Sequence, residues 1–430
     1  MLSINIDDVI KVLESMKYHL IGFGVVLVLA IIAMIACMKL PKAKKAMIRC
    51  QAGLAILLAL VITVNLICFG PMFTVINLAM GGGSITEESM AEAYEVNTEL
   101  VGEGVTLLEN NGALPLASGS NLNVFGWAST APVYGGVGSG ALNDQYEVTD
   151  LITGLKNAGL NVNEDLVNFY ETYQAERPSV GMWAQDWTLP EPNVNAYTDE
   201  LMSGAKEFSD TALVVISRPG GENADMPTDM VSVVDGSWLE RDAITGNSYF
   251  NGVYDDSLNE GNDWDEGDHY LQLSNREEEM LQMVCDNFDK VIVLINTNNA
   301  MELGFLKEYG VDAAVYAPCP GQNGFNAVGQ VFTGEVNPSG KTVDTFVYDL
   351  FNTPTANNFG QFTYDNMDEH AVVTTSFSTG EQSTALPSFV NYVEGIYVGY
   401  KFYETAAAEG LIDYDSTVVY PFGYGLSYTT

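Results

Sequence analysis

The sequence of 430 residues contains 56 acidic and 17 basic residues, which gives a formal net charge of −39 at pH 7. Because nucleic acid binding needs a basic face, this balance argues against a nucleic acid partner. Hydrophobic residues make up 47% of the sequence and charged residues 17%, so the chain is too apolar for a disordered acidic protein and can bury a core.

The first 80 residues contain two long uncharged runs. Leu20–Met38 would form about 29 Å of helix, which is enough to cross the hydrocarbon layer of a membrane. A second run begins at Ala52. We therefore predict a transmembrane hairpin with helices at 19–38 and 52–80, followed by a glycine-rich joint. A signal peptide fits less well, because the first run is long and no small-residue cleavage site follows it. A buried helical hairpin is the other alternative.

Charge predicts how this hairpin is oriented. The link at 39–51 holds five basic residues and no acidic one, so the positive-inside rule places it in the cytoplasm. The short segment 1–18 and the large domain at 84–430 would then both lie outside the cell. The sequence thus predicts a multi-pass plasma membrane protein whose large domain is extracellular. Seven of the 17 basic residues lie in the first 50 positions. From Gly83 onward the sequence therefore contains ten basic residues and 53 acidic ones.

The large domain alternates helical and strand patterns. Ser274 and Glu277 form a capping-box pattern that opens a helix ending at Asn287. The run TALVVIS has the continuous apolar character of a strand covered on both faces. This alternation predicts a doubly wound α/β sandwich with a mostly parallel sheet. The expected helices lie at 85–110, 150–158, 274–287, 300–309 and 321–332, and the expected strands at 122–125, 212–217, 290–296 and 313–317.

Open sheets of this kind bind ligands at the carboxyl ends of their strands. Glu222 follows the TALVVIS strand on a glycine-flanked loop, where a carboxyl group can be held in a cleft and its pKa tuned for proton donation. A solvated loop glutamate is the alternative reading. The segment Met226–Tyr270 has no clear element of its own and is long enough to form a lid or site wall.

Cofactor signals are absent from the sequence. Its three histidines and the two cysteines of the large domain stand apart, so they suggest no metal site and no Ser/His/Asp triad. The glycine-rich run at 135–140 lacks the spacing of a dinucleotide fingerprint. Seven carboxylates crowd residues 255–268, but the EF-hand order fails, which favours a solvated acidic loop over calcium. Calcium binding by this loop is the alternative.

All five tryptophans lie in the large domain, at least four of them in predicted loops. Indole faces on loops are surfaces on which sugar rings stack. We therefore consider Trp238 and Trp264, together with Arg218 at the end of the TALVVIS strand, as candidate substrate-binding residues.

Six segments in order resemble the carboxyl-terminal α/β sandwich domain of glycoside hydrolase family 3, the β-glucosidase type. NPSGK and PFGYGLSY are the more specific motifs among them. The resemblance extends from Ser84 to Thr430. Its segments are Val101–Leu116, Val214–Asp225, Val291–Leu306, Pro318–Lys341, Val393–Thr405 and Val419–Thr429.

The resemblance implies a retaining, exo-acting glycosidase that needs no cofactor. In this family a (β/α)₈ barrel supplies the aspartate nucleophile and the sandwich supplies the glutamate acid/base, whose position Glu222 matches. Asn223 and Met226 depart from the glycine and arginine of the family pattern. No segment of this sequence resembles the barrel, so we expect the chain to be inactive alone and to act on a β-glucoside or β-xyloside only with a barrel, on a separate chain or in a longer product.

A second reading is a non-catalytic, membrane-anchored module that binds glycans or a protein. Such a module needs no barrel. The two readings differ in whether hydrolysis appears when a barrel is supplied.

Overall fold

The computed structural model describes residues 6–73, 76, 85–136, 142, 146–181, 184–221, 224–237, 252–257, 262–358, 364–375, 382–385, 389 and 391–429. The chain divides into two compact units. The smaller consists of residues 1–86 with 371–385, and the larger of 87–370 with 386–430.

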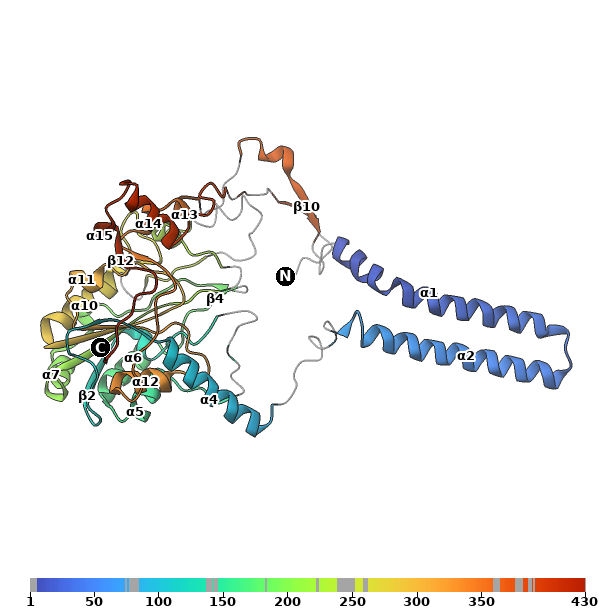
Figure 1. Cartoon of the computed structure of the whole chain (residues 1–430), viewed down its shortest axis with the longest axis horizontal. Coiled ribbons are helices and arrows are strands. Elements are labelled where there is room, and N and C mark those ends of the chain that lie inside the picture. The colour runs from blue at the N-terminus through green and yellow to red at the C-terminus, as the bar shows by residue number, and fades with distance from the viewer. Residues whose placement is uncertain are drawn as a thin grey trace. The chain divides into compact units, whose positions relative to one another are not determined.

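Two long antiparallel helices dominate the smaller unit, α1 (Ile6–Ala36) and α2 (Lys42–Cys68) (Figure 1). Both are long and apolar enough to be candidate membrane spans, and most of their large hydrophobic side chains are exposed. Helix α2 begins inside the predicted basic link, because the residues after Pro41 are good helix formers. It ends at Cys68 rather than at residue 80, just before a Gly-Pro pair that a helix does not accommodate. A short hairpin, β10 (Val372–Thr375) with β11 (Gln382–Ala385), belongs to the same unit.

A six-stranded sheet forms the centre of the larger unit, in the order β1-β8-β7-β6-β2-β3. All neighbouring pairs are parallel except β1 with β8, so the predicted mostly parallel sheet is confirmed. The six strands are β1 (Thr106–Asn110), β2 (Asn121–Phe125), β3 (Asn161–Val162), β6 (Thr211–Arg218), β7 (Lys290–Thr297) and β8 (Ala313–Tyr316).

Each face of this sheet carries its own core. Along β6, Val214 and Ile216 point into one core with the helices α6, α7, α10 and α11, while Leu213 and Val215 point into the other with α5 and α12. Helices α4, α5 and α12 lie together on one side in Figure 1. Alternate residues of the strand therefore enter different cores, which explains why it reads as an unbroken apolar run. The covering helices are α4 (Glu87–Gly104), α5 (Leu151–Asn157), α6 (Glu164–Tyr173), α7 (Asp199–Phe208), α10 (Asn275–Asn287), α11 (Phe305–Glu308) and α12 (Phe325–Thr333).

The predicted helix at 85–110 is wrong in its last turn. Helix α4 ends at Gly104 and the chain continues as strand β1, in which Leu107 and Leu108 are both fully buried. Consecutive apolar residues suit a strand that is covered on both faces better than one stripe of a helix. The helices expected at 300–309 and 321–332 are also shorter, because each begins after a loop.

The capping box at the start of α10 is confirmed in both of its hydrogen bonds. Helices α6 and α7 were not predicted, although Asn163 and Thr198 cap their first turns through their side chains. The smaller elements are β4 (Val180–Gly181), β5 (Ala184–Gln185), α8 (Met230–Val234), β9 (Phe346–Val347), α13 (Pro354–Asn358), α14 (Tyr400–Ala408), α15 (Tyr414–Thr417) and β12 (Val418–Tyr420).

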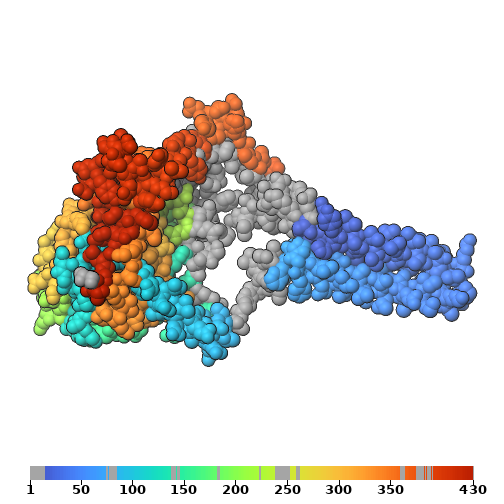
Figure 2. Space-filling model, in the orientation of Figure 1, coloured from blue at the N-terminus to red at the C-terminus, as the bar shows by residue number. Residues whose placement is uncertain are grey.

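Strand β1 is held by segments that come much later in the chain. The Leu426 amide donates to the Leu107 carbonyl oxygen at 2.8 Å, and the Gly340 amide donates to the Val105 carbonyl oxygen at 3.2 Å. Two residues after Leu426, the Tyr428 hydroxyl donates to a carbonyl oxygen of α12 at 2.8 Å. In the space-filling view the C-terminal residues, in red, run over the surface beside α12 and α4 (Figure 2).

Candidate functional site

A pocket of about 700 Å³ opens where strands β6 and β7 end. Gly220 and Gly221 follow β6, and Asn298 and Asn299 follow β7, and all four line the pocket. This position at the carboxyl ends of two adjacent parallel strands is where open α/β sheets bind ligands. The pocket thus brings together the loop after Ser217, which carries Glu222, and the loop after Asn296.

The residues on either side of Glu222 meet at this pocket. Gly221 and Ala224 both line it and pair as an isolated antiparallel bridge, in which the Ala224 amide donates to the Gly221 carbonyl oxygen at 3.2 Å. Glu222 and Asn223 lie outside the described residues. The chain therefore enters and leaves the Glu222 position at the wall of the pocket.

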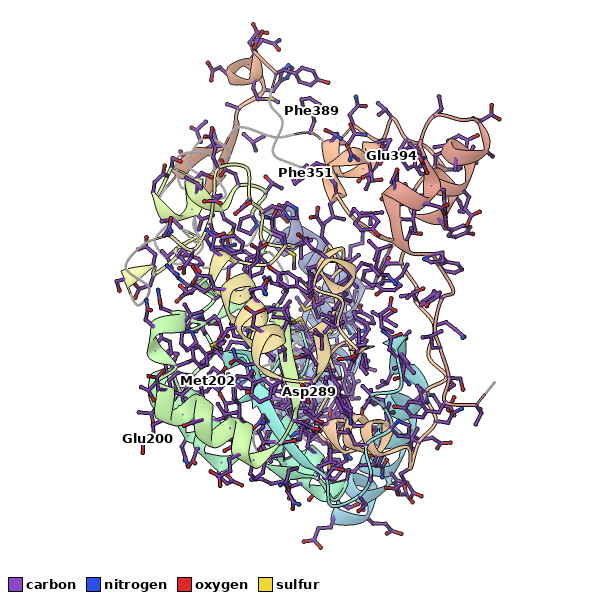
Figure 3. All side chains as sticks on the ribbon, turned by 90° about the vertical axis from the view of Figure 1, so that its left-hand side faces the viewer. Glu200, Met202, Asp289, Phe351, Phe389 and Glu394 are labelled. Carbon is purple, nitrogen blue, oxygen red and sulfur yellow. The ribbon has the colours of Figure 1, made fainter. Side chains whose placement is uncertain are left out.

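Aromatic side chains form part of the pocket wall. Phe351, Phe402 and Tyr403 line the pocket together with Val398 and Leu350. In Figure 3, Phe351 lies above Asp289, the residue directly before β7. Burial raises the pKa of Tyr403 to about 12, so its hydroxyl keeps its proton. Sequence reasoning missed this wall, although Phe402 and Tyr403 belong to one of the quoted segments.

His269 joins three parts of the pocket wall. Its Nδ1 accepts from the Leu271 amide at 3.1 Å, and its Nε2 lies 3.1 Å from Glu302 Oε1. Because Nδ1 accepts, the proton of the neutral ring is on Nε2 and is donated to Glu302. The same Glu302 oxygen accepts from the Leu350 amide at 2.7 Å, and the imidazole and the Phe351 ring pack in a T-shaped pair with centroids 5.1 Å apart. The polar atoms of His269 are thus all engaged within the wall.

Arg218 is fully buried and does not face the pocket. Its guanidinium donates twice to Glu277, at 2.8 and 2.5 Å, and also to the carbonyl oxygens of Tyr270 and Gln272. The Glu277 carboxylate accepts in turn from the amide of Ser274 at the start of α10. These contacts tie the end of β6 to α10 and to the chain before it, and they use the groups with which Arg218 could hold a sugar. We assign it a structural role.

The tryptophans that the structure describes are buried rather than displayed. Trp264 is 6% exposed and packs edge-on against Tyr254, and Trp127 and Trp187 are buried as well. This burial leaves no ring face for a sugar, so Trp264 is not part of the site proposed below. Trp183 and Trp238 lie outside the described residues.

A second polar cluster lies buried where strand β2 ends. The Glu191 carboxylate accepts from the Trp127 amide at 2.7 Å and from the Tyr197 hydroxyl at 2.8 Å. The Tyr197 and Tyr170 hydroxyls lie 2.7 Å apart. Burial raises the pKa of Glu191 to about 8, and these hydrogen bonds oppose that rise only in part. Arg177 stacks over the Trp127 ring nearby, and burial lowers its pKa to about 10.

Carboxylates of the acidic loop accept hydrogen bonds from the protein itself. Asp263 accepts from the Tyr254 hydroxyl at 2.7 Å, and Asp268 accepts from the Gln272 side chain at 2.7 Å. Among the described residues, which leave out 258–261 of this loop, no group of three or more His, Cys, Asp or Glu side chains could hold a metal ion.

The six-stranded, mostly parallel sheet with a core on each face is an α/β sandwich with a pocket at its carboxyl edge. Residues 105–400 match the model of the glycosyl hydrolase family 3 C-terminal domain, and the chain belongs to this family.

Curated relatives and solved structures agree with this assignment. A β-glucosidase of Ruminococcus albus is 32% identical over 80% of this chain and 28% of its own length, and β-glucosidase A of Butyrivibrio fibrisolvens is 30% identical over 82% and 37%. β-Glucosidase 3B of Thermotoga neapolitana, solved with α-D-glucose, superposes with a TM-score of 0.54 at 28% identity, covering 80% of this chain and 39% of that one. The chain thus spans about a third of the length of these relatives.

Proposed function

We propose that this chain carries the acid/base domain of a retaining β-glycosidase that removes terminal β-linked glucose- or xylose-type sugars. Glu222 is the proposed acid/base residue. The catalytic aspartate would come from a (β/α)₈ barrel of the kind that the family pairs with this sandwich.

The observation that carries this proposal is the position of Gly221 and Ala224. They flank Glu222, bond to each other and line a pocket at the carboxyl ends of β6 and β7. The buried Arg218 contacts fix the strand end four residues before Glu222. A proton donor needs a backbone that is held in place, because general acid catalysis requires the donor to lie within hydrogen-bond distance of the leaving oxygen.

The chemistry divides between two carboxyl groups. In a retaining mechanism they lie about 5 to 5.5 Å apart, one attacking the anomeric carbon while the other protonates the leaving oxygen. Glu222 would give its proton to the glycosidic oxygen as the bond to the sugar breaks. It would then take a proton from the water that releases the sugar from the aspartate.

The two long helices support a proposal for the cellular location. We propose that α1 and α2 cross the plasma membrane, with their basic link in the cytoplasm and the larger unit outside the cell. From residue 15 onward both helices expose apolar side chains, which suits a lipid environment. Oligosaccharides at the cell surface would then be the source of substrate.

The test uses the full chain in lipid nanodiscs, alone and with a family 3 barrel domain added. We expect hydrolysis of phenyl and 4-nitrophenyl β-D-glucoside only when the barrel is present. Glu222→Gln should slow the phenyl substrate, which has the poorer leaving group, by about 100-fold or more, and the nitrophenyl substrate less. Glu200→Gln, on the exposed side of α7, is the matched control.

Equal rates for Glu222→Gln and the parent chain would remove Glu222 from the acid/base role. Glycoside binding without hydrolysis in either mixture would instead favour the non-catalytic binding module.

A further inference from the structure

Arg177 is a largely buried cation whose hydrogen bonds go to uncharged groups. Its Nε donates to the Ala131 carbonyl oxygen at 2.6 Å, and its Nη2 donates to the Ser217 hydroxyl at 2.5 Å. The guanidinium thus joins the loop after β2 to the end of β6. No carboxylate of the described ranges lies within ion-pair distance of it. Buried charges in proteins normally have a partner of opposite sign, and this one lacks it.

The charged groups near Arg177 leave a surplus of positive charge. Arg218 and Glu277 form a closed ion pair at 2.5 Å. Glu191 lines the same small void as Arg177, but its pKa of about 8 keeps most of it protonated at pH 7. Asp186 is partly exposed and is hydrogen-bonded within its own loop. At neutral pH the buried groups that the structure describes here therefore carry one more positive than negative charge.

Two fully buried hydrogen-bond donors close to this cation have no acceptor. Tyr270 and Trp187 are both 0% exposed, and neither the Tyr270 hydroxyl nor Trp187 Nε1 has a hydrogen-bond partner in the part of the chain that the structure describes. Their rings form a T-shaped pair with centroids 4.9 Å apart. Burial raises the pKa of Tyr270, and the charges of Arg218 and Arg177 oppose that rise, so the hydroxyl lies within the field of both cations. Leaving such donors unpaired is costly.

The topology of the sheet adds an independent argument for a ligand at this place. Strand β2 has β3 on one side and β6 on the other, so the order of the parallel strands changes direction between β2 and β6. Open α/β sheets bind ligands outside the carboxyl ends of the strands at such a switch point. Arg177 bonds to the segments that leave β2 and end β6, which places its charge at this point.

We propose that the larger unit binds a compact monovalent anion here, with Arg177, Tyr270 and Trp187 as its donors, and that chloride fits the site. A halide accepts hydrogen bonds from N–H and O–H groups and brings the one negative charge that the cluster lacks. The inference goes beyond the proposed hydrolysis and does not depend on the role of Glu222.

The bound anion should be released as the pH rises above 8. Glu191 ionises in that range, and its negative charge beside Arg177 replaces that of the anion. Arg177, whose pKa is about 10, stays largely charged at pH 9, and burial raises the pKa of Tyr134, which faces it, to about 12. The affinity for chloride should therefore fall several-fold between pH 7 and pH 9 in the parent chain, and not in Glu191→Gln.

Line broadening of the chloride NMR signal measures this binding directly. The full chain is kept in lipid nanodiscs, and sodium isethionate, which has a bulky anion, holds the ionic strength constant. Exchange with a protein site broadens the chloride resonance, and a competing anion such as bromide narrows it again. Because the formal net charge of the chain is −39, a general attraction of chloride is not expected, and saturable broadening indicates a site.

Two variants and a control locate the site. Arg177→Gln should weaken chloride binding by at least about ten-fold, because it removes the charge. Tyr270→Phe keeps the ring and removes only the hydroxyl, and it should weaken binding by about ten-fold. Lys206→Gln, which removes an exposed positive charge of α7, is the matched control and should bind like the parent. If Arg177→Gln does not fold, Tyr270→Phe decides.

Several results would overturn the inference. One is broadening that does not saturate in the parent chain, and another is an affinity that neither Arg177→Gln nor Tyr270→Phe changes. Displacement of chloride by acetate at a much lower concentration than by bromide would show that the site takes a carboxylate and not a halide. A parent affinity that is equal at pH 7 and pH 9 would refute the link to Glu191. None of these results alters the hydrolysis test of Glu222→Gln.

Discussion

The buried carboxyl group of Glu191 should make the larger unit lose stability as the pH rises toward 8. Its pKa is about 8 in the folded chain and about 4.5 when exposed. Because the folded value is raised, the stabilisation is complete below pH 4.5 and is lost as the pH passes up to 8. Each unit of pKa difference corresponds to about 1.4 kcal/mol. Between pH 5 and pH 8 the loss from this residue is therefore on the order of 3 kcal/mol.

Glu191→Gln isolates this effect. The amide can still accept from the Trp127 backbone and bond to Tyr197, but it does not ionise. The free energy of unfolding should then fall less with pH in the variant, and the two curves should diverge by about 3 kcal/mol between pH 5 and 8. Glu200→Gln, an exposed glutamate, should follow the parent curve.

Urea unfolding of the full chain followed by tryptophan fluorescence provides the assay. All five tryptophans lie beyond residue 86, so the signal reports the larger unit and not the helical hairpin. A difference between Glu191→Gln and the parent that stays constant from pH 5 to 8 would refute the reasoning, because it would mean that Glu191 titrates alike in both states.

Two further substitutions test the packing that positions the site, in the same unfolding assay. Arg218→Met should cost about 3 to 5 kcal/mol because it leaves the Glu277 carboxylate buried without its cation, whereas Lys156→Met, which breaks a surface ion pair, should cost less than about 1 kcal/mol. A cost for Arg218→Met as small as that of the control would contradict the structural role. Gly154→Ala would put a Cβ 2.3 Å from a backbone oxygen at the start of α12 and should cost more than about 2 kcal/mol, while Gly204→Ala, with open space in α7, should stabilise by about 0.5 to 1 kcal/mol. Equal effects at the two glycines would show that the α5–α12 contact is looser than described.

The central sheet could be predicted from the sequence because its strands are continuous apolar runs. β6 and β7 deviate from the expected bounds by no more than one residue at either end. Strand β1 could not be separated from the preceding helix, because its neighbours are Tyr316 and Leu426, which are far away in sequence. The periodicity of hydrophobic residues over a short stretch of sequence does not show which distant segments will pair.

The candidate site shows the same division. The loops that follow β6 and β7 could be located from the rule for parallel strands, and they line the pocket. The aromatic part of the pocket wall could not be predicted, because Phe351 and Tyr403 come from segments that meet the sheet edge only in the folded chain. The structural role of Arg218 could not be predicted either, since its partner Glu277 lies 59 residues further along the chain, in the first turn of α10.

The hydrogen bond between Leu107 and Leu426 limits how early this edge of the sheet can be completed during synthesis. The ribosome synthesises Leu107 some 300 residues before Leu426, so this edge of the sheet waits until Leu426 has emerged. Helices α1 and α2, in contrast, are complete within the first 68 residues. The amino-terminal hairpin is therefore finished and can leave the ribosome long before the larger unit closes. During that interval the unpaired edge and the unfilled half of the core are open to chaperones and proteases, and the time needed for translation becomes part of the folding time of the unit.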